Sequence, residues 1–324
     1  MSVRLSQMEL IMKDSLIILT GPTAVGKTDL SIRLAKAVDG EIISADSIQV
    51  YKDMDIGSAK ITTDEMNGVR HHLIDVLYPY EDFNVVTFKK MADDAISDIR
   101  SRGKVPIITG GTGFYIQAVL YDIDFKENED DGYRAFLEKL LEEEGALYLH
   151  DMLKEIDEKS AQDIHFNNSK KVIRALEYYH QTGEKISEHN KAERAKSSPY
   201  NYAYFVLNCD RSKLYKRIEK RIDIMLEQGL VGEVQSLINK YKLTSDMVSM
   251  QGLGYKEIYA YLKGEISIDE AVYILKRDTR HFAKRQLTWF RREKDVLWVD
   301  KDIYDTDDKC LDYMLNILKD KRIL

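Results

Sequence analysis

One stretch, residues 16–28 with the sequence LIILTGPTAVGKT, constrains the fold more than any other part of this 324-residue chain. Its apolar start, Leu16 to Leu19, is typical of a buried strand, and the helix-favouring DLSIRLAKAV follows directly. Between them, Gly21 to Thr28 match the pattern G-x-x-x-x-G-K-[ST] at every fixed position. In such a loop, backbone N–H groups and the start of a helix surround an anion. The stretch therefore predicts a phosphate or pyrophosphate site, and the motif alone suggests ATP or GTP binding.

Two side chains of this loop have expected roles. Lys27 supplies a positive charge to the terminal phosphate, and the Thr28 hydroxyl takes a position on Mg²⁺. The structural alternative is a tight strand-to-helix turn that binds no ligand. The remaining positions of the predicted anion site are Gly21, Pro22, Thr23, Ala24, Val25 and Gly26.

The composition, with 44% hydrophobic and 32% charged residues, is that of a soluble globular protein. No apolar run approaches the length of a membrane span, and the N-terminus lacks the pattern of a signal peptide. Cys209 and Cys310 lie far apart in the sequence and match no metal spacing, which favours free thiols in a reducing compartment. We therefore expect a cytoplasmic protein.

Short apolar strands alternate with helical stretches in the first part of the chain. This alternation predicts an α/β fold, a P-loop NTPase-like parallel sheet with flanking helices. Ligands of such sheets gather at the carboxyl ends of the strands, so we expect the P-loop, Asp46 and Gly110 to Thr112 to converge on one cleft. Strands are expected at 16–19, 41–44, 71–75 and 105–109, and a helix at 85–101.

The composition changes to charged, helix-favouring sequence between residues 125 and 195. We interpret 125–195 as a helical insertion domain within a catalytic core formed by 1–124 and 196–324. Further elements are expected at 133–144 and 168–181 (helices), 202–207 (strand), 212–228 and 269–291 (helices) and 296–299 (strand).

Asp46 follows the second predicted strand and is the first candidate for chemistry. A carboxylate opposite a phosphate loop accepts a proton in small-molecule kinases, and in other P-loop proteins it orients Mg²⁺. A helix cap or an ion pair is the structural alternative. The strand 105–109 ends in Gly-Gly-Thr, without the acid with which nucleotide hydrolases hold Mg²⁺, and Thr112 offers a hydroxyl to a ligand instead.

The last long helix is predicted to carry a basic face. A net charge of −7 argues against indiscriminate nucleic-acid binding. A local stripe of positive charges along one helix face nevertheless fits a phosphate backbone or a pyrophosphate. A solvated, ion-paired face is the alternative. A smaller group, Lys170, Lys171 and Arg174, lies in the insertion. The stripe consists of Arg277, Arg280, Lys284, Thr288 and Arg291, which recur at steps of three or four.

Seven segments between about residues 16 and 300 resemble, in order, the motifs of bacterial tRNA dimethylallyltransferases, also called tRNA isopentenyltransferases. They are GPTAVGKT, ADSIQVYKDMDIGSAK, HHLID, ITGGTGFYIQA, KKVIRALE, MQGLGYKEI and TRHFAKRQLTWFR. The resemblance implies transfer of the dimethylallyl group from dimethylallyl diphosphate to the N6 amine of adenosine 37, the base 3′ of the anticodon, in tRNAs reading codons that start with U. The P-loop and Mg²⁺ would then hold the diphosphate leaving group.

The resemblance also implies roles for individual residues. Asp46 would orient the adenine amine and accept its proton, while Thr112 and Arg134 would line the reaction channel. The insertion would grip the anticodon stem of tRNA, and we expect a monomer. Implied tRNA contacts are Asp46, Ser47, Ile48, Gln49, Lys170, Lys171, Val172, Ile173, Arg174, Gln251, Gly252, Leu253, Gly254, Tyr255 and Lys256, to which the basic face adds Arg280, Lys284 and Arg285.

Three other hypotheses stay open from the residues alone. The first is a P-loop small-molecule kinase with Asp46 as its base. The second is a non-enzymatic RNA-binding or nucleotide-sensing protein. The third is a prenyltransferase whose acceptor is a free adenine nucleotide.

Overall fold

The computed structural model describes residues 15–125 and 131–324, which divide into two compact units. Of these residues, 15–120 and 199–324 form the first unit, and those between Tyr121 and Ser198 form the second. Residues 1–14 of the predicted core and 126–130 of the predicted insertion lie outside the described residues.

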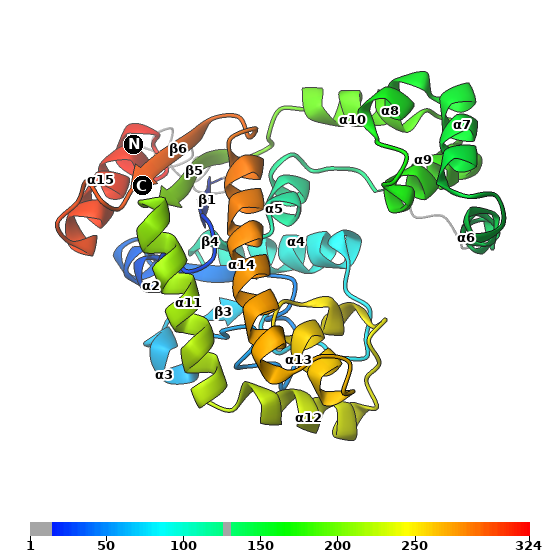
Figure 1. Cartoon of the computed structure of the whole chain (residues 1–324). Coiled ribbons are helices and arrows are strands. Elements are labelled where there is room, and N and C mark those ends of the chain that lie inside the picture. The colour runs from blue at the N-terminus through cyan, green and yellow to red at the C-terminus, as the bar shows by residue number, and fades with distance from the viewer. Residues whose placement is uncertain (1–14, 126–130) are drawn as a thin grey trace. The chain divides into compact units, whose positions relative to one another are not determined.

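The described part of the first unit contains a six-stranded sheet whose strands all pair in parallel, in the order β3-β2-β4-β1-β5-β6 (Figure 1). β1 is central and all six of its residues are buried, because helices cover both faces of the sheet. The predicted α/β fold of the P-loop type is confirmed. The strands are β1 (Ser15–Thr20), β2 (Gly40–Ala45), β3 (His71–His72), β4 (Val105–Gly110), β5 (Asn201–Asn208) and β6 (Val296–Asp300).

Helices flank the sheet because the connections between parallel strands cross over its faces. α2 (Lys27–Ala37) and α15 (Asp307–Asp320) pack together on one face, and α4 (Val85–Ser101) and α5 (Gly113–Leu120) pack on the other. A short helix, α3 (Thr63–Met66), precedes β3.

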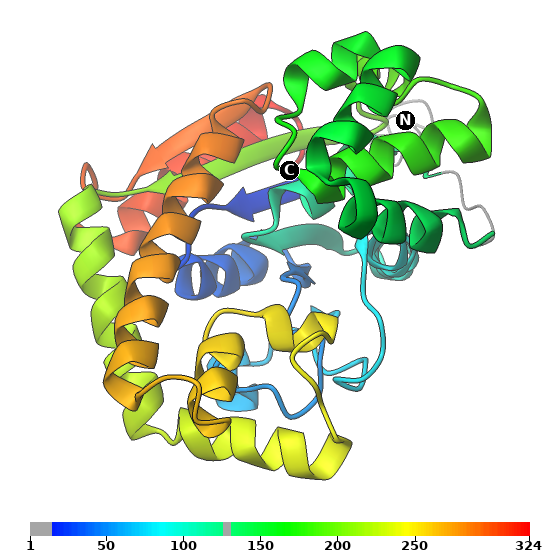
Figure 2. The same ribbon diagram turned by 45° about the vertical axis from the view of Figure 1, so that its right-hand side comes forward.

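A helical segment connects β5 to β6. Its two longest helices, α11 (Arg211–Glu227) and α14 (Ile268–Phe290), lie side by side (Figures 1 and 2). Between them are α12 (Leu230–Tyr241), the 3₁₀ helix η1 (Val248–Gln251) and α13 (Tyr255–Leu262). Ser267 caps α14 by accepting a hydrogen bond from the Glu270 N–H at 3.2 Å.

The third strand is shorter than its sequence predicts. Only His71 and His72 pair with β2, so the prediction was wrong over residues 73–75. Leu73 and Asp75 have φ values of 63° and 56°, a left-handed backbone that ends the extended conformation.

The second unit is helical throughout its described elements, with a hydrophobic core of its own. These elements are α6 (Tyr133–Glu144), α7 (Ala146–Ile156), α8 (Glu158–Asp163), α9 (Ser169–Thr182) and α10 (Ile186–Ala195). Leu137, Leu149, Leu153 and Leu176 are among the residues buried in that core. The buried Asp157 carboxylate accepts hydrogen bonds from Ser160 and Ser187 and so connects α8 to α10. Within the described residues, no helix is long and apolar enough to cross a membrane.

Candidate active site

The P-loop joins β1 to α2 in a backbone conformation that its glycines permit. Gly26, the residue before α2, has a φ of 91°, in the left-handed region that favours glycine. The Lys27 ammonium donates hydrogen bonds to the Gly21 and Pro22 carbonyl oxygens at 3.0 and 2.9 Å. Burial and the neighbouring Arg221 guanidinium lower the pKa of Lys27 to about 8.

Hydrogen bonds join the carboxyl ends of β1, β2 and β4 beside this loop. The Thr20 hydroxyl donates to the Gly110 carbonyl at 2.6 Å, and the Thr112 N–H donates to the Ala45 carbonyl at 3.2 Å. A side chain at position 110 would place its Cβ 2.2 Å from the Ala45 oxygen, so the close approach of β4 to β2 requires glycine there. The predicted convergence of these strand ends is therefore realised.

Gln286 of α14 connects the P-loop to the end of β4. Its Oε1 accepts from the Thr23 N–H at 2.9 Å, and its Nε2 donates to the Gly111 carbonyl at 3.0 Å. The side chain is buried, and these two bonds join segments more than 170 residues away in sequence. The place of Gln286 in the site was not predicted from the sequence.

Two adjoining cavities, of about 660 and 450 Å³, open at the carboxyl edge of the sheet. The larger is lined by Lys27, Thr28 and Gly26 of the P-loop, and by Gly110 and Gly111 at the end of β4. The smaller has more apolar walls, which include Phe83 and Tyr115. Residues common to both cavities are Thr23, Ala24, Asp46, Ser58, Ala59, Arg221, Met225 and Phe282.

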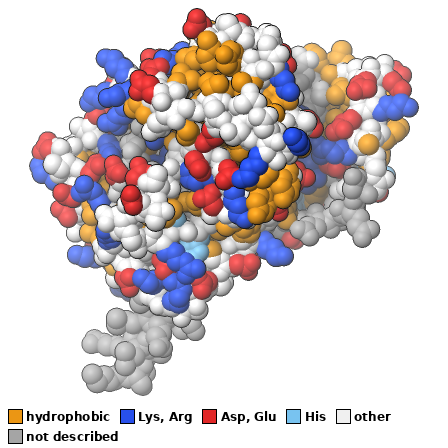
Figure 3. All heavy atoms as spheres, turned by 90° about the horizontal axis from the view of Figure 1, so that it is seen from below, with side chains coloured by type: hydrophobic (Ala, Val, Ile, Leu, Met, Phe, Trp, Pro, Cys, Tyr) orange, Lys and Arg blue, Asp and Glu red, His pale blue; other side chains and the backbone are white. Residues whose placement is uncertain are grey.

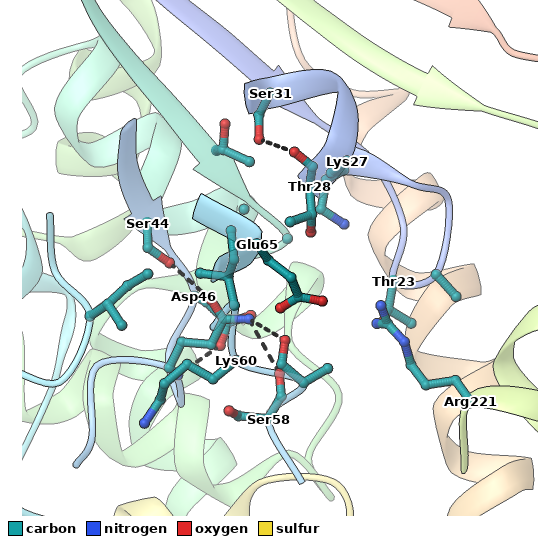
Figure 4. Close-up of a pocket in the computed structure, with 18 of the residues that line it drawn as sticks. Thr23, Lys27, Thr28, Ser31, Ser44, Asp46, Ser58, Lys60, Glu65 and Arg221 are labelled. Atoms are coloured by element: carbon teal, nitrogen blue, oxygen red, sulfur yellow. Dashed lines mark hydrogen bonds between the residues drawn. The ribbon is translucent and has the colours of Figure 1, made fainter. Parts of the chain in front are cut away.

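Asp46 lies where the two cavities meet. Its Oδ1 accepts hydrogen bonds from the N–H groups of Ile48 and Gln49 at 2.9 and 3.3 Å, which fixes the turn after β2. Figure 4 shows Asp46, Lys27 and Arg221 at the same pocket, from the turn after β2, the start of α2 and the middle of α11. A carboxylate and two cations thus share one cavity wall.

Arg221 of α11 was missed by the sequence analysis. Leu214, Ile218 and Ile222 form the buried stripe of this helix, and Arg221 falls next to that stripe at helical spacing. An arginine beside an apolar stripe was the available signal. The structure places it on the wall shared by both cavities.

Most of the expected ligand contacts in the first unit line these cavities. The P-loop residues Gly21, Pro22 and Val25 are buried and support the loop from behind, while the other five residues line the larger cavity. Gln49 also lines the larger cavity. Lining the smaller one are Ser47, Ile48, Thr112, Gln251, Gly252, Leu253, Gly254, Lys256 and Arg285.

Three residues of the segments expected to contact tRNA have buried side chains. Tyr255 is 0% exposed, and its hydroxyl donates to Glu233 Oε1 at 2.9 Å. Val172 and Ile173 are 0% and 3% exposed in the core of the second unit. A fully packed side chain offers no surface to RNA, so only the backbone of these three residues is left to contact it, and their place in the tRNA-binding segments stays a prediction. Their neighbours Lys170, Lys171 and Arg174 are exposed on α9.

Arg134 lies at the start of α6, in the second unit. It donates to Glu138 at 3.2 Å and to Glu177 at 3.3 Å, and the Glu177 carboxylate also accepts from Arg174 at 3.1 Å. Glu177 thus holds two of the predicted ligand-binding arginines together. The role of Arg134 in a reaction channel stays a prediction.

The basic face of α14 is partly neutralised by acids that lie elsewhere in the sequence. Arg280 of this face pairs with Glu219 of α11 at 2.6 Å, and Lys276, beside the face, pairs with Asp223 at 2.5 Å. Lys284 is exposed and lines a further cavity of about 490 Å³ together with His281, Arg285, Thr288, Trp289 and Arg292. The molecular face in Figure 3 likewise mixes Lys and Arg with Asp and Glu.

The described residues contain no cluster of three or more His, Cys, Asp or Glu side chains able to hold a metal ion. The exposed Thr28 hydroxyl in the larger cavity fits Mg²⁺ in another way, because this ion commonly keeps several waters and binds phosphate oxygens of the ligand.

Comparison of this chain with known proteins identifies the family to which it belongs. The model of the IPP transferase family matches residues 49–293, and a model described as isopentenyl transferase matches residues 14–78. A tRNA dimethylallyltransferase from Lachnoclostridium phytofermentans is 61% identical over 310 residues, which cover 95% of this chain and 99% of that protein.

Solved structures agree. The full-length tRNA isopentenylpyrophosphate transferase of Bacillus halodurans is 43% identical, with a TM-score of 0.72 over 95% of this chain and 98% of its own. A eukaryotic dimethylallyltransferase, described as acting on tRNA, is 28% identical, with a TM-score of 0.80 over 94% of this chain and 80% of its own. Because the first family model spans most of the chain and the curated relative nearly all of it, the resemblance read from the motifs is confirmed: this chain is an enzyme of the IPP transferase family.

Proposed function

We propose that this chain transfers the dimethylallyl group of dimethylallyl diphosphate to the N6 amine of adenosine 37, next to the anticodon, in tRNAs reading codons that start with U. The observation that carries the proposal is the meeting of two cavities at Asp46. One cavity contains the P-loop, and the other is lined by apolar and polar residues from eight separate segments of the chain.

The donor end of the reaction is assigned to the P-loop. The N–H groups at the start of α2, the Lys27 ammonium and the Arg221 guanidinium stabilise the negative charge that develops on diphosphate as its allylic C–O bond breaks. Thr28 would hold Mg²⁺, which supplies further neutralisation of the diphosphate charge.

The acceptor end is assigned to Asp46 and the smaller cavity. The adenine amine is a weak nucleophile because its lone pair is delocalised into the ring. Asp46 accepts a hydrogen bond from this amine, orients it, and receives its proton as the new C–N bond forms. The bonds balance: one C–O bond breaks, one C–N bond forms, diphosphate departs and a proton goes to the carboxylate.

The apolar walls of the smaller cavity suit the unstacked adenine and the prenyl chain. Phe83, Tyr115 and Phe282 contribute aromatic surface there. Extrusion of the base costs a few kcal/mol, less from an anticodon loop than from a duplex. We further propose that the helical insertion grips the anticodon stem, that the enzyme acts as a monomer, and that it works in the cytoplasm.

The test is incubation of the purified protein with Mg²⁺, labelled dimethylallyl diphosphate and unmodified tRNA carrying A or G at position 37. Label should enter only the A-containing tRNA. Label in AMP would support the free-nucleotide hypothesis instead. Failure to label either acceptor, together with tight ATP binding, would support the kinase.

A further inference from the structure

Glu233, in the first turn of α12, lines neither active-site cavity, yet its carboxylate gathers four hydrogen-bond donors. Its Oε2 accepts from the N–H groups of Asp55 and Ile56 at 2.9 and 2.6 Å. Its Oε1 accepts from the Gly57 N–H at 3.0 Å and from the Tyr255 hydroxyl at 2.9 Å. Three successive backbone N–H groups that point at one carboxylate form an anion-binding nest, here filled from within the protein.

The loop bound in this way forms part of both cavity walls. Asp55, Ile56 and Lys60 line the larger cavity, Gly57 lines the smaller one, and Ser58 and Ala59 line both. Glu233 therefore fixes, from behind, the backbone of a segment whose other side faces the reacting groups.

The same loop is connected to Asp46 through Gln49. The Gln49 Nε2 donates to the Ser58 and Ala59 carbonyls, both at 3.3 Å. The Gln49 N–H in turn donates to Asp46 Oδ1 at 3.3 Å. A displacement of the loop would thus be passed to the turn that holds the Asp46 carboxylate.

Loop 55–59 packs closely against Tyr255 of α13, which restricts the position of its backbone. A Cβ built on Gly57 would lie 2.6 Å from Cζ of the fully buried Tyr255 ring. Tyr255 both packs against Gly57 and shares its hydrogen-bond acceptor, so the two contacts fix the backbone in distance and in direction. This gives the buried tyrosine of the MQGLGYKEI segment a role that RNA contact did not explain.

We infer that Glu233 is a positioning residue that sets the acceptor side of the active site by holding loop 55–59 and, through Gln49, the Asp46 carboxylate. This inference rests on the proposed function, because the acceptor side is defined by the proposed RNA substrate. The P-loop, which binds the donor diphosphate, is held by other contacts, those of Gln286 and the Lys27 bonds, although loop 55–59 also lines the larger cavity.

The variant that isolates this role is Glu233→Gln. It keeps the length of the side chain, but its NH₂ group must face donors in either orientation, because all four partners of Glu233 donate. Glu227→Gln, an exposed position at the end of α11 that lines neither cavity, is the matched control.

Steady-state kinetics should separate the two substrates. With an anticodon stem-loop RNA, we expect Glu233→Gln to lower kcat/KM about tenfold or more, through a higher KM for RNA and a lower kcat. The KM for dimethylallyl diphosphate should stay within roughly a factor of two. The effect should not add to that of Gln49→Ala, because both changes disturb the same chain of contacts. Unchanged RNA kinetics, or an equal rise of both KM values, would overturn the inference.

Hydrogen exchange measured by mass spectrometry gives a readout that does not depend on activity. The amides of residues 55–57 should exchange faster in Glu233→Gln than in the wild type or in Glu227→Gln, while peptides from β1 and β4 keep their protection. Equal exchange at 55–57 would show that Glu233 does not hold the loop. If the wild type prenylates no RNA, the proposed function fails, and this exchange measurement still decides whether Glu233 fixes the cavity wall.

Discussion

Lys27 and Asp46 bring opposite charges into one cavity, and the surroundings of each side chain explain its expected task. Lys27 is enclosed by the loop whose carbonyls it binds, and burial lowers its pKa to about 8. Asp46 keeps its turn in place with one oxygen, Oδ1, and lines both cavities. An enclosed ammonium suits charge stabilisation, and a carboxylate at the junction suits proton transfer.

Asp46→Asn should slow turnover by roughly 10²- to 10⁴-fold, the usual contribution of a general base. The asparagine Oδ1 still accepts from the Ile48 and Gln49 N–H groups, so the turn and RNA binding should be retained. Single-turnover rates with saturating RNA, together with RNA binding curves, measure the two effects separately. Asp64→Asn, an exposed carboxylate outside both cavities, serves as the control. A full-rate Asp46→Asn enzyme would remove this carboxylate from the mechanism.

Donor capture should weaken at alkaline pH. The lowered pKa of Lys27 means that its charge is present below about pH 8 and is lost as pH rises through that value. The kcat/KM for dimethylallyl diphosphate should therefore fall above about pH 8, as a profile measured with saturating RNA would report. Lys27→Met should have a low kcat/KM at every pH and lack this inflection. An identical alkaline limb in wild type and variant would assign the titration to another group.

At the scale of secondary-structure elements, α14 acts as a brace across the site. Gln286 binds the P-loop on one side and the segment after β4 on the other, while Arg280 and Lys276 pair with α11. The helix thus joins the donor cavity to α11. Because Arg280 of the basic stripe is paired with Glu219 of α11, less positive charge of this helix is available to bind RNA.

Gln286→Leu should raise the KM for dimethylallyl diphosphate about tenfold, because the Thr23 N–H and the Gly111 carbonyl lose their buried partner. Gln235→Leu on the exposed surface of α12 is a control of the same chemistry. Substrate titrations of both variants at fixed RNA concentration measure the change. A donor KM equal to that of wild type would show that the loop keeps its shape without α14.

At the scale of the whole molecule, the chain is one α/β unit interrupted by a helical one. All strand pairs of the sheet lie within 15–120 and 199–324, and the second unit has its own buried core. The strand pairs of the sheet are therefore contained in the first unit, and a separate hydrophobic core is contained in the second.

Replacing residues 121–198 with a flexible linker should leave the first unit folded and able to bind the donor. Affinity for an anticodon stem-loop should fall, and the dependence of binding on salt should become less steep, since the basic group of α9 is removed. Thermal melts, donor binding and RNA titrations at several salt concentrations measure these effects. RNA affinity and salt slope equal to those of the full chain would contradict the proposed grip of the insertion.

Features that depend on neighbouring residues were predictable from the sequence. The P-loop, the alternation of strands and helices, and the positions of Asp46 and Thr112 at strand ends follow from local spacing and periodicity. The third strand was predicted too long because an apolar pattern does not reveal the left-handed backbone at Leu73 and Asp75. Val172 and Ile173 were expected to contact tRNA because the whole KKVIRALE segment matches a family motif. The helical period of α9, however, places these two side chains on its buried face.

An anion-binding loop at the edge of a parallel sheet is specified locally, since eight consecutive residues encode that loop. Which distant residues complete the site depends instead on the packing of the folded chain. Arg221, Gln286 and Glu233 meet Asp46, Thr23 and the 55–57 loop across separations of about 175 to 263 residues. Such pairings depend on how helices pack over the sheet, and no local pattern in the chain records that packing.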